Sequence, residues 1–241
     1  MKRLIPLLLP LLLCGFFGDG DEPKKPLPQV DTTDDTIKSY TGGKTLAPYK
    51  IALHDGPKAG QYWEVGSDSY DIDSTSRWQI SKLDGDVALV EHRLKMSADM
   101  FKSDYVIAYR VDLKPEKGKP QVTRAWIAKP GGNPVRITVR TMPPETDEPK
   151  AEKKDEGEAF KDLELAGASW RGKLFTQEAD DMTVKLWVAD DGWFDKIIKT
   201  TAGDDYEQKL ALFGNDAKPL LVWPEKWQEA GAPDAKDPDG D

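Results

Sequence analysis

The chain has a single cysteine, Cys14, among its 241 residues. One cysteine excludes an intramolecular disulfide, so a packed core has to supply the stability. Histidine is almost as scarce, because only His54 and His92 are present. Neither histidine lies in a recognisable nucleophile–base or zinc-ligand pattern. The only long apolar run is Leu4–Leu13, which is too short to span a bilayer as a helix.

Basic residues are also fewer than acidic ones: 34 Lys and Arg stand against 43 Asp and Glu, which gives a net charge of −9. A chain this acidic repels nucleic acid and anionic lipid headgroups, so we exclude both as direct partners. The acids around Asp71 lack the glycine and the glutamate of an EF-hand loop. We therefore expect no metal site and no cofactor.

What the N-terminus does contain is Lys2 and Arg3, the apolar run, and then the sole cysteine. A charged start followed by an apolar run of this length is typical of a signal peptide, here residues 1–13. The order Leu11-Leu12-Leu13-Cys14-Gly15 resembles the lipobox of bacterial lipoproteins, which implies a lipid on Cys14. We expect an exported, membrane-anchored protein facing the periplasm or the cell exterior. Cleavage near Gly18-Asp19-Gly20, giving a secreted soluble protein, and an uncleaved anchor are the alternatives.

Composition divides the rest of the chain into one domain and three polar segments. Residues 14–35 are rich in Gly, Asp, Pro and Lys, which predicts a flexible tether. Residues 36–229 form a single β-rich domain, in which the acidic residues 143–158 are a disordered insertion. Residues 230–241 have the same acidic character, and we expect a disordered tail.

Alternation of apolar and polar residues, typical of half-buried strands, dominates this domain. Val135, Ile137 and Val139 alternate with polar neighbours, as do Val184 and Leu186, and we expect all five to face the core. Short turns between the runs predict neighbouring antiparallel strands in a meander. The expected strands are 48–54, 61–67, 76–83, 87–95, 105–114, 121–129, 134–141, 162–176, 181–189 and 193–200.

Helix signals are few. Residues 97–103 and 224–229 each predict one short helical turn, the second beginning at a proline. Residues 205–213 fit both a helix and a strand, and we favour the strand because it extends the meander. The sequence thus predicts a mainly β fold, an antiparallel meander sheet with one or two short helices. A β-sandwich, in which the sheet is covered on both sides, is the alternative.

Most of the eight tryptophans should lie in the core, since the side chain buries a large area and suits strands. Trp187 is the exception, because it shares a strand face with Thr183 and Lys185. An aromatic ring on a polar face can meet a partner or line a ligand site. Trp187 and Trp126 are therefore our candidate ligand- or partner-binding residues, with core packing as the alternative for each.

From Leu163 to Gly214, turn and strand signals follow in a set order: Leu165-Ala166-Gly167, Trp170, Gly172–Leu174, Thr183–Val188, Asp191-Gly192 and Lys196–Lys199. This order resembles the closing hairpins of exported bacterial proteins of the Lol-like half-barrel type, a group that includes lipoprotein carriers and envelope lipoproteins. The resemblance covers about fifty residues. It implies a curved, half-barrel-like sheet with an apolar concave side, closed by one or two short helices.

These features together favour a non-enzymatic, lipid-anchored envelope protein. The apolar concave side that the resemblance implies would hold an apolar ligand or an envelope partner. A secreted carbohydrate-binding module, with exposed tryptophan as a stacking platform, is one alternative. A hydrolase whose site carries no recognisable motif is the other.

Overall fold

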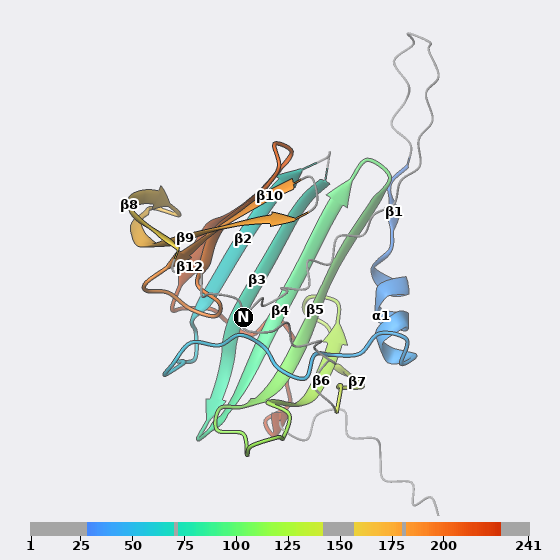
Figure 1. Cartoon of the computed structure of the whole chain (residues 1–241). Helices are drawn as coiled ribbons and strands as arrows, with labels where there is room; N and C mark the ends of the chain where they lie inside the picture. Colours follow the sequence, from blue (N-terminus) through green and yellow to red (C-terminus); the bar gives the residue numbers. More distant parts are fainter. Residues whose placement is uncertain (1–27, 70–71, 142–156, 180–181, 228–241) are drawn as a thin grey trace, which may run out of the picture.

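The computed structural model describes residues 28–69, 72–141, 157–179 and 182–227, which form one helix and twelve strands (Figure 1). No helix in these ranges is long and apolar enough to cross a membrane. The elements in chain order are β1 (Val30–Asp31), α1 (Thr33–Thr41), β2 (Tyr62–Ser69), β3 (Ile72–Asp84), β4 (Val87–Ala98), β5 (Phe101–Asp112), β6 (Val122–Ala128), β7 (Val135–Ile137), β8 (Glu158–Leu165), β9 (Ala168–Ala179), β10 (Met182–Ala189), β11 (Ile197–Ala202) and β12 (Tyr206–Gly214).

Eleven strands form one path in the order β7-β6-β5-β4-β3-β2-β12-β11-β10-β9-β8, and β1 pairs in parallel with the start of β5. All neighbours along the path are antiparallel. The sheet therefore consists of two meanders, β2–β7 and β8–β12, joined where β2 pairs with β12. It is not closed, because β7 and β8 form its two edges. The expected antiparallel meander is confirmed.

The sheet is strongly curved. The ring centroids of Trp63 in β2 and Trp170 in β9 are 5.5 Å apart, although three strands separate β2 from β9. In a flat sheet four strand spacings would place them about 19 Å apart. We call the face of β2–β7 that carries Trp63, Trp78 and Tyr109 the inner face, and the opposite face, with Glu91 and Trp126, the outer face.

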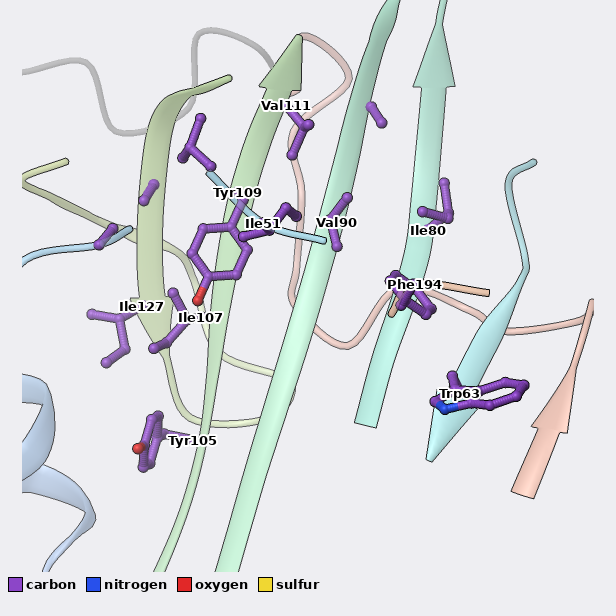
Figure 2. Packing of buried hydrophobic residues seen from close by; sticks show 14 of the residues in the cluster. Ile51, Trp63, Ile80, Val90, Tyr105, Ile107, Tyr109, Val111, Ile127 and Phe194 are labelled. Carbon is purple, nitrogen blue, oxygen red and sulfur yellow. The ribbon is translucent and has the colours of Figure 1, made fainter. Parts of the chain in front are cut away.

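The inner face of the first meander is covered by chain that precedes β2. Figure 1 shows residues 44–60, the crossing segment, running across the sheet between α1 and β2. Ala47 N donates to Thr138 O at one end (2.9 Å), and Gly60 N donates to Ile80 O at the other (2.8 Å). Ile51 of this segment is buried among Val90, Tyr109 and their neighbours (Figure 2). The largest apolar core of the protein lies between this segment and the sheet.

The outer face is covered by residues 216–227, the C-terminal strap. Leu221 and Trp227 of the strap are buried against Leu89, Val106 and Trp126 of the sheet. Gly131 N donates to Leu220 O (2.7 Å), and Val222 N donates to Gly132 O (3.0 Å), which fixes the strap along the end of β6. The parts of β4, β5 and β6 that lie under the strap are therefore buried on both faces.

A buried carboxylate, Glu91, holds the strap against the sheet. Its oxygens accept hydrogen bonds from the backbone N–H groups of Leu220 (2.7 Å) and Leu221 (3.1 Å) and from Trp223 Nε1 (2.7 Å). Gln79 Nε2 (3.0 Å) and the Ser81 hydroxyl also donate to it. Glu91 has no exposed surface, and these donors replace the water that a carboxylate loses on burial.

Several sequence predictions were wrong. Residues 48–54 are not a strand, because they lie in the crossing segment and make only isolated hydrogen bonds, such as Val122 N to Tyr49 O (3.1 Å), instead of a ladder with a neighbouring strand. Residues 97–103 form the end of the β4–β5 hairpin instead of a helical turn. The helix α1 and strand β1 begin inside the range 14–35 that was expected to be a tether. Asp31 Oδ1 accepts a hydrogen bond from Thr33 N (3.0 Å) in a turn that leads into the helix, a signal too local to stand out.

Other predictions were confirmed or lie outside the described residues. Residues 205–213 form strand β12, as favoured. The second short helix is reduced to a turn at residues 225–227, and its remainder is not described. Cys14, the signal peptide, most of the acidic insertion and the tail also lie outside the described residues.

The expected core-facing residues divide into two groups. Ile137 is buried at 5% exposure and Val139 packs against the core, but Val135 is 49% exposed. Val184 and Leu186 are only half-buried and belong to neither apolar cluster. The expectation therefore failed for Val135, Val184 and Leu186. In β10 the opposite face packs on the inner core, through Trp187 and Ala189.

Candidate functional site

The structure places the two candidate tryptophans far apart in the strand order, on β6 and β10. Trp126 has no exposed surface, and its ring packs edge-on against Trp223 of the strap (centroids 5.2 Å apart). Trp187 is half-buried, with Lys199 Nζ 5.3 Å from its ring centroid. Trp187 packs against the inner core but keeps some accessible surface, whereas Trp126 is fully buried under the strap.

A different surface is partly exposed, and all of its side chains are uncharged. It lies on the inner face of β2, β3 and β4, between the crossing segment and the hairpin ends. We call it the neutral strip, since none of its side chains carries a charge. It consists of Val65, Ser67, Ser69, Ile72, Ser74, Ser76, Leu94, Met96 and Ala98. Ser69 is buried, and all the others are half-buried.

The opposite face of the same strands is charged. Its residues include Glu64, Asp73, Arg77, Arg93 and Lys95. Arg77 pairs with Glu64 (3.5 Å), and Arg93 binds Asp104 through two nitrogens (2.8 and 2.6 Å). Successive residues of a strand point to opposite faces, so the sequence itself sorts charge to one side. The sorting indicates that the neutral strip faces something other than open solvent.

The strip ends at a stacked pair of rings. His92 lies parallel to Trp78, with centroids 3.7 Å apart and an interplanar angle of 10°. Ser76 Oγ is 2.8 Å from His92 Nε2. Burial lowers the pKa of His92 to about 3, so the imidazole is neutral at physiological pH.

Ser76 and His92 have the spacing of a nucleophile and its general base. An imidazole with a pKa near 3 is a weak base, because efficient general bases titrate near the working pH. Within the described ranges, no carboxylate hydrogen-bonds to the other nitrogen of His92. The pair therefore works as a neutral hydrogen-bonding unit at the end of the strip.

Hydroxyl groups line the strip beside its apolar residues. Ser67 Oγ and Ser74 Oγ are 2.6 Å apart, and each retains capacity for a further hydrogen bond. Ser103 of β5, paired with Met96, is 2% exposed, and its Oγ has no hydrogen-bond partner in the described part of the chain. A buried hydroxyl without a partner is unusual and calls for an explanation.

The phenols next to the strip are also held neutral. Burial raises the pKa of Tyr105 to about 12, and it raises the pKa of Tyr109 and Tyr40 as well. Ile37 and Tyr40 of α1 pack on the same core. The inner face thus presents hydroxyls, an imidazole and hydrocarbon, without ionised groups among these residues. In the described ranges no group of three or more His, Cys, Asp or Glu side chains is placed to hold a metal ion.

Sequence reasoning missed this surface because serine contributes little to a hydrophobic pattern. A usable signal was present in the charges. Across residues 92–96 the order is His, Arg, Leu, Lys, Met, which places both cations on one face and three uncharged residues on the other. Sorting by charge, and not by hydrophobicity, would have identified the strip.

No protein-family model matches the chain, and no curated protein matches it either. The geometry and chemistry of its own residues therefore carry the functional argument.

Proposed function

We propose that this chain is an exported, lipid-anchored, non-enzymatic protein that binds a neutral amphiphile along the neutral strip. The proposal rests on the observation that the strip is uncharged and only half-buried, while the other face of the same strands is charged. A contiguous, partly exposed surface with apolar side chains is where proteins often bind ligands or partners. Partial burial without charge favours a surface that an apolar ligand completes.

The strip offers both kinds of contact that an amphiphile needs. Val65, Leu94 and Met96 would bury hydrocarbon, which stabilises a complex by about 25 cal/mol per Å² removed from water. Ser67, Ser74 and the orphaned Ser103 hydroxyl would bond its polar group. A charged headgroup would lose hydration here without meeting an opposite charge. The strip therefore favours a neutral ligand over an anionic one.

The entry point of the chain supports an anchor at the same end of the sheet. Val30 pairs with Phe101 at the β4–β5 hairpin, whose end adjoins Ala98 of the strip. Val30 and Met100 are 61% and 65% exposed, although both are apolar. A lipid on Cys14 would hold this end of the sheet towards the membrane, the source of amphiphilic ligands. A Cys14→Ser chain should then leave the detergent phase, and unchanged partitioning would contradict the anchor.

The ligand proposal is tested by displacement of a neutral fluorescent probe, N-phenyl-1-naphthylamine. We would use the full chain carrying Cys14→Ser, purified without detergent. Monoacylglycerol should displace the probe at lower concentration than the fatty acid of the same length. Equal or better displacement by the fatty acid would contradict a neutral site.

Adjacent residues of β4 provide the matched variants. Met96→Lys places a charge on the strip, and we expect probe affinity to fall at least tenfold. Lys95→Met changes the neighbouring residue on the outer face and should leave affinity unchanged. If both variants bind like the parent chain, the ligand does not use the strip.

A further inference from the structure

A loop from the second meander lies directly beyond the neutral strip. Residues 190–196 connect β10 to β11 and place Phe194 on the inner face at 6% exposure. The Phe194 ring lies 5.9 Å from Trp78, the next inner-facing residue after Ser76 along β3. Figure 2 shows the ring in front of β3 beside Ile80. Phe194 therefore covers the position where the apolar strip would otherwise continue.

The loop holds this position in a strained backbone conformation. Phe194 and Lys196 have φ values of 57° and 61°, in the left-handed region that non-glycine residues avoid. Each such residue costs about 1–2 kcal/mol, so contacts with the rest of the protein must hold the loop in place. Lys196 N donates to Trp193 O (3.0 Å) and closes the tight turn.

The main polar contact is made by His54 of the crossing segment. Phe194 N donates to His54 Nδ1 (3.2 Å), and His54 Nε2 is 2.9 Å from Gln61 Oε1. Gln61 Oε1 can only accept, so the proton of the neutral ring is on Nε2 and Nδ1 is free to accept. A doubly protonated His54 has no acceptor, and the bond from Phe194 is then lost.

Charged groups on both packed elements influence this histidine. Lys196 of the loop disfavours the imidazolium, and Asp55 of the crossing segment favours it. The exposed Asp195 carboxylate is bound to Ile197 N (3.1 Å). Burial is the largest influence and lowers the pKa of His54 below its usual 6.5. Acid therefore favours any state in which His54 is less buried and no longer accepts the hydrogen bond from Phe194 N.

We propose that loop 190–196 is an acid-released plug: Phe194 closes the inner end of the neutral strip, and protonation of His54 frees the strained loop. Withdrawal of Phe194 extends the strip by the rings of Trp78 and Trp63 and admits a longer hydrocarbon chain. This inference rests on the proposed function, because it assigns a regulation to the same site.

The first test needs no ligand. Amide hydrogen exchange of residues 192–197 is compared between the parent chain and His54→Asn at the same pH, since Asn keeps a side-chain acceptor but does not titrate. At pH 7.5 the two chains should exchange at similar rates. At pH 5.5 the parent chain should exchange faster than His54→Asn. Equal exchange in the two chains at pH 5.5 would overturn the acid release, whatever the strip binds.

The second test measures affinity for N-phenyl-1-naphthylamine. One proton taken up near pH 6.5 changes the ratio of open to closed loop by at most tenfold per pH unit. We expect affinity to rise up to about tenfold from pH 7.5 to pH 5.5 in the parent chain and to stay flat in His54→Asn. Unchanged parent affinity with faster loop exchange would retain the release and exclude its role in binding.

Discussion

The two meanders of the sheet differ in what covers them. The first, β2–β7, lies between the crossing segment on its inner face and the C-terminal strap on its outer face. The outer apolar cluster draws only on β4, β5, β6 and the strap. In β8, at the far edge of the second meander, every residue is exposed or half-buried. The curvature of the sheet brings parts of β9 and β10 into the inner core, but much of the second meander faces solvent.

The difference shows that the same alternating sequence pattern corresponds to two different burial patterns in this protein. In β4 and β5 both members of an alternating pair are buried, one in each cluster, as with Val106 and Ile107. In β10 the neighbours Leu186 and Trp187 are both half-buried. The alternation of apolar and polar residues identifies strands in both meanders. Which face of a strand is buried depends on the segments that pack on it.

The largest expected effect concerns the covered region. Trp126→Ala should lower the free energy of unfolding by about 3–5 kcal/mol, because it leaves a cavity under the strap. Urea denaturation followed by circular dichroism measures this. A loss below about 1 kcal/mol would mean that the strap does not stay on the outer face in solution.

The next prediction concerns the carboxylate under the strap. Glu91→Gln replaces one acceptor oxygen by an NH₂ group that faces N–H donors, and we expect a loss of about 3 kcal/mol. Trp223 fluorescence should shift to longer wavelength as the strap loosens. The control is Glu64→Gln on the same face, whose ion pair with Arg77 is partly solvated and should contribute less than about 1 kcal/mol. Equal losses would contradict the special role of Glu91.

Acid should weaken the covered region before it protonates the carboxylates. The folded protein holds His92 at a pKa of about 3, whereas in the unfolded chain the value is near 6.5. Because the unfolded state binds the proton more tightly, stability is lost as the pH falls below 6.5, by up to about 1.4 kcal/mol per unit. Urea midpoints at pH 7, 6 and 5 measure the slope. His92→Gln should flatten it, and an unchanged slope would place the titration elsewhere.

The smallest effects are expected in the second meander. Leu186→Ala should cost about 1 kcal/mol or less, since its side chain is half-buried and belongs to neither apolar cluster. Trp187→Ala should cost more, about 1–2 kcal/mol, because its ring packs against the inner core, and thermal melting of both variants would show the difference. A loss above 2 kcal/mol at Leu186 alone would mean that this face is covered, for example by residues outside the described ranges.

The sequence predicted strands well because their signal is local. Alternation and short turns placed most of the strands and favoured β12 correctly over a helix. The crossing segment was taken for a strand, although the partners of Ile51 and Leu53 are side chains of the sheet and not another strand. Strand propensity describes a half-buried extended segment and does not specify its hydrogen bonds.

The errors at the candidate site have a different cause. Trp126 is buried by a strap that lies about ninety residues later in the chain, and no local pattern carries that information. Glu91 was hidden in an apolar run, where a single acid looks like a surface position. The neutral strip was missed because its serines contribute little to a hydrophobic pattern. Each case depends on contacts between distant segments, which propensity and periodicity do not encode.

The order of strands also has a consequence for how the protein is made. Within the first meander each strand pairs with its neighbour in sequence, so the meander can form while the rest of the chain is still being synthesised. Its junction with the second meander joins residues about 140 positions apart, and its outer face waits for residues 216–227. Leu89, Val106 and Trp126 therefore remain open to water, and to chaperones, until residues 216–227 have been added. A chain truncated before the strap should be captured by such chaperones, although all of its strands are complete.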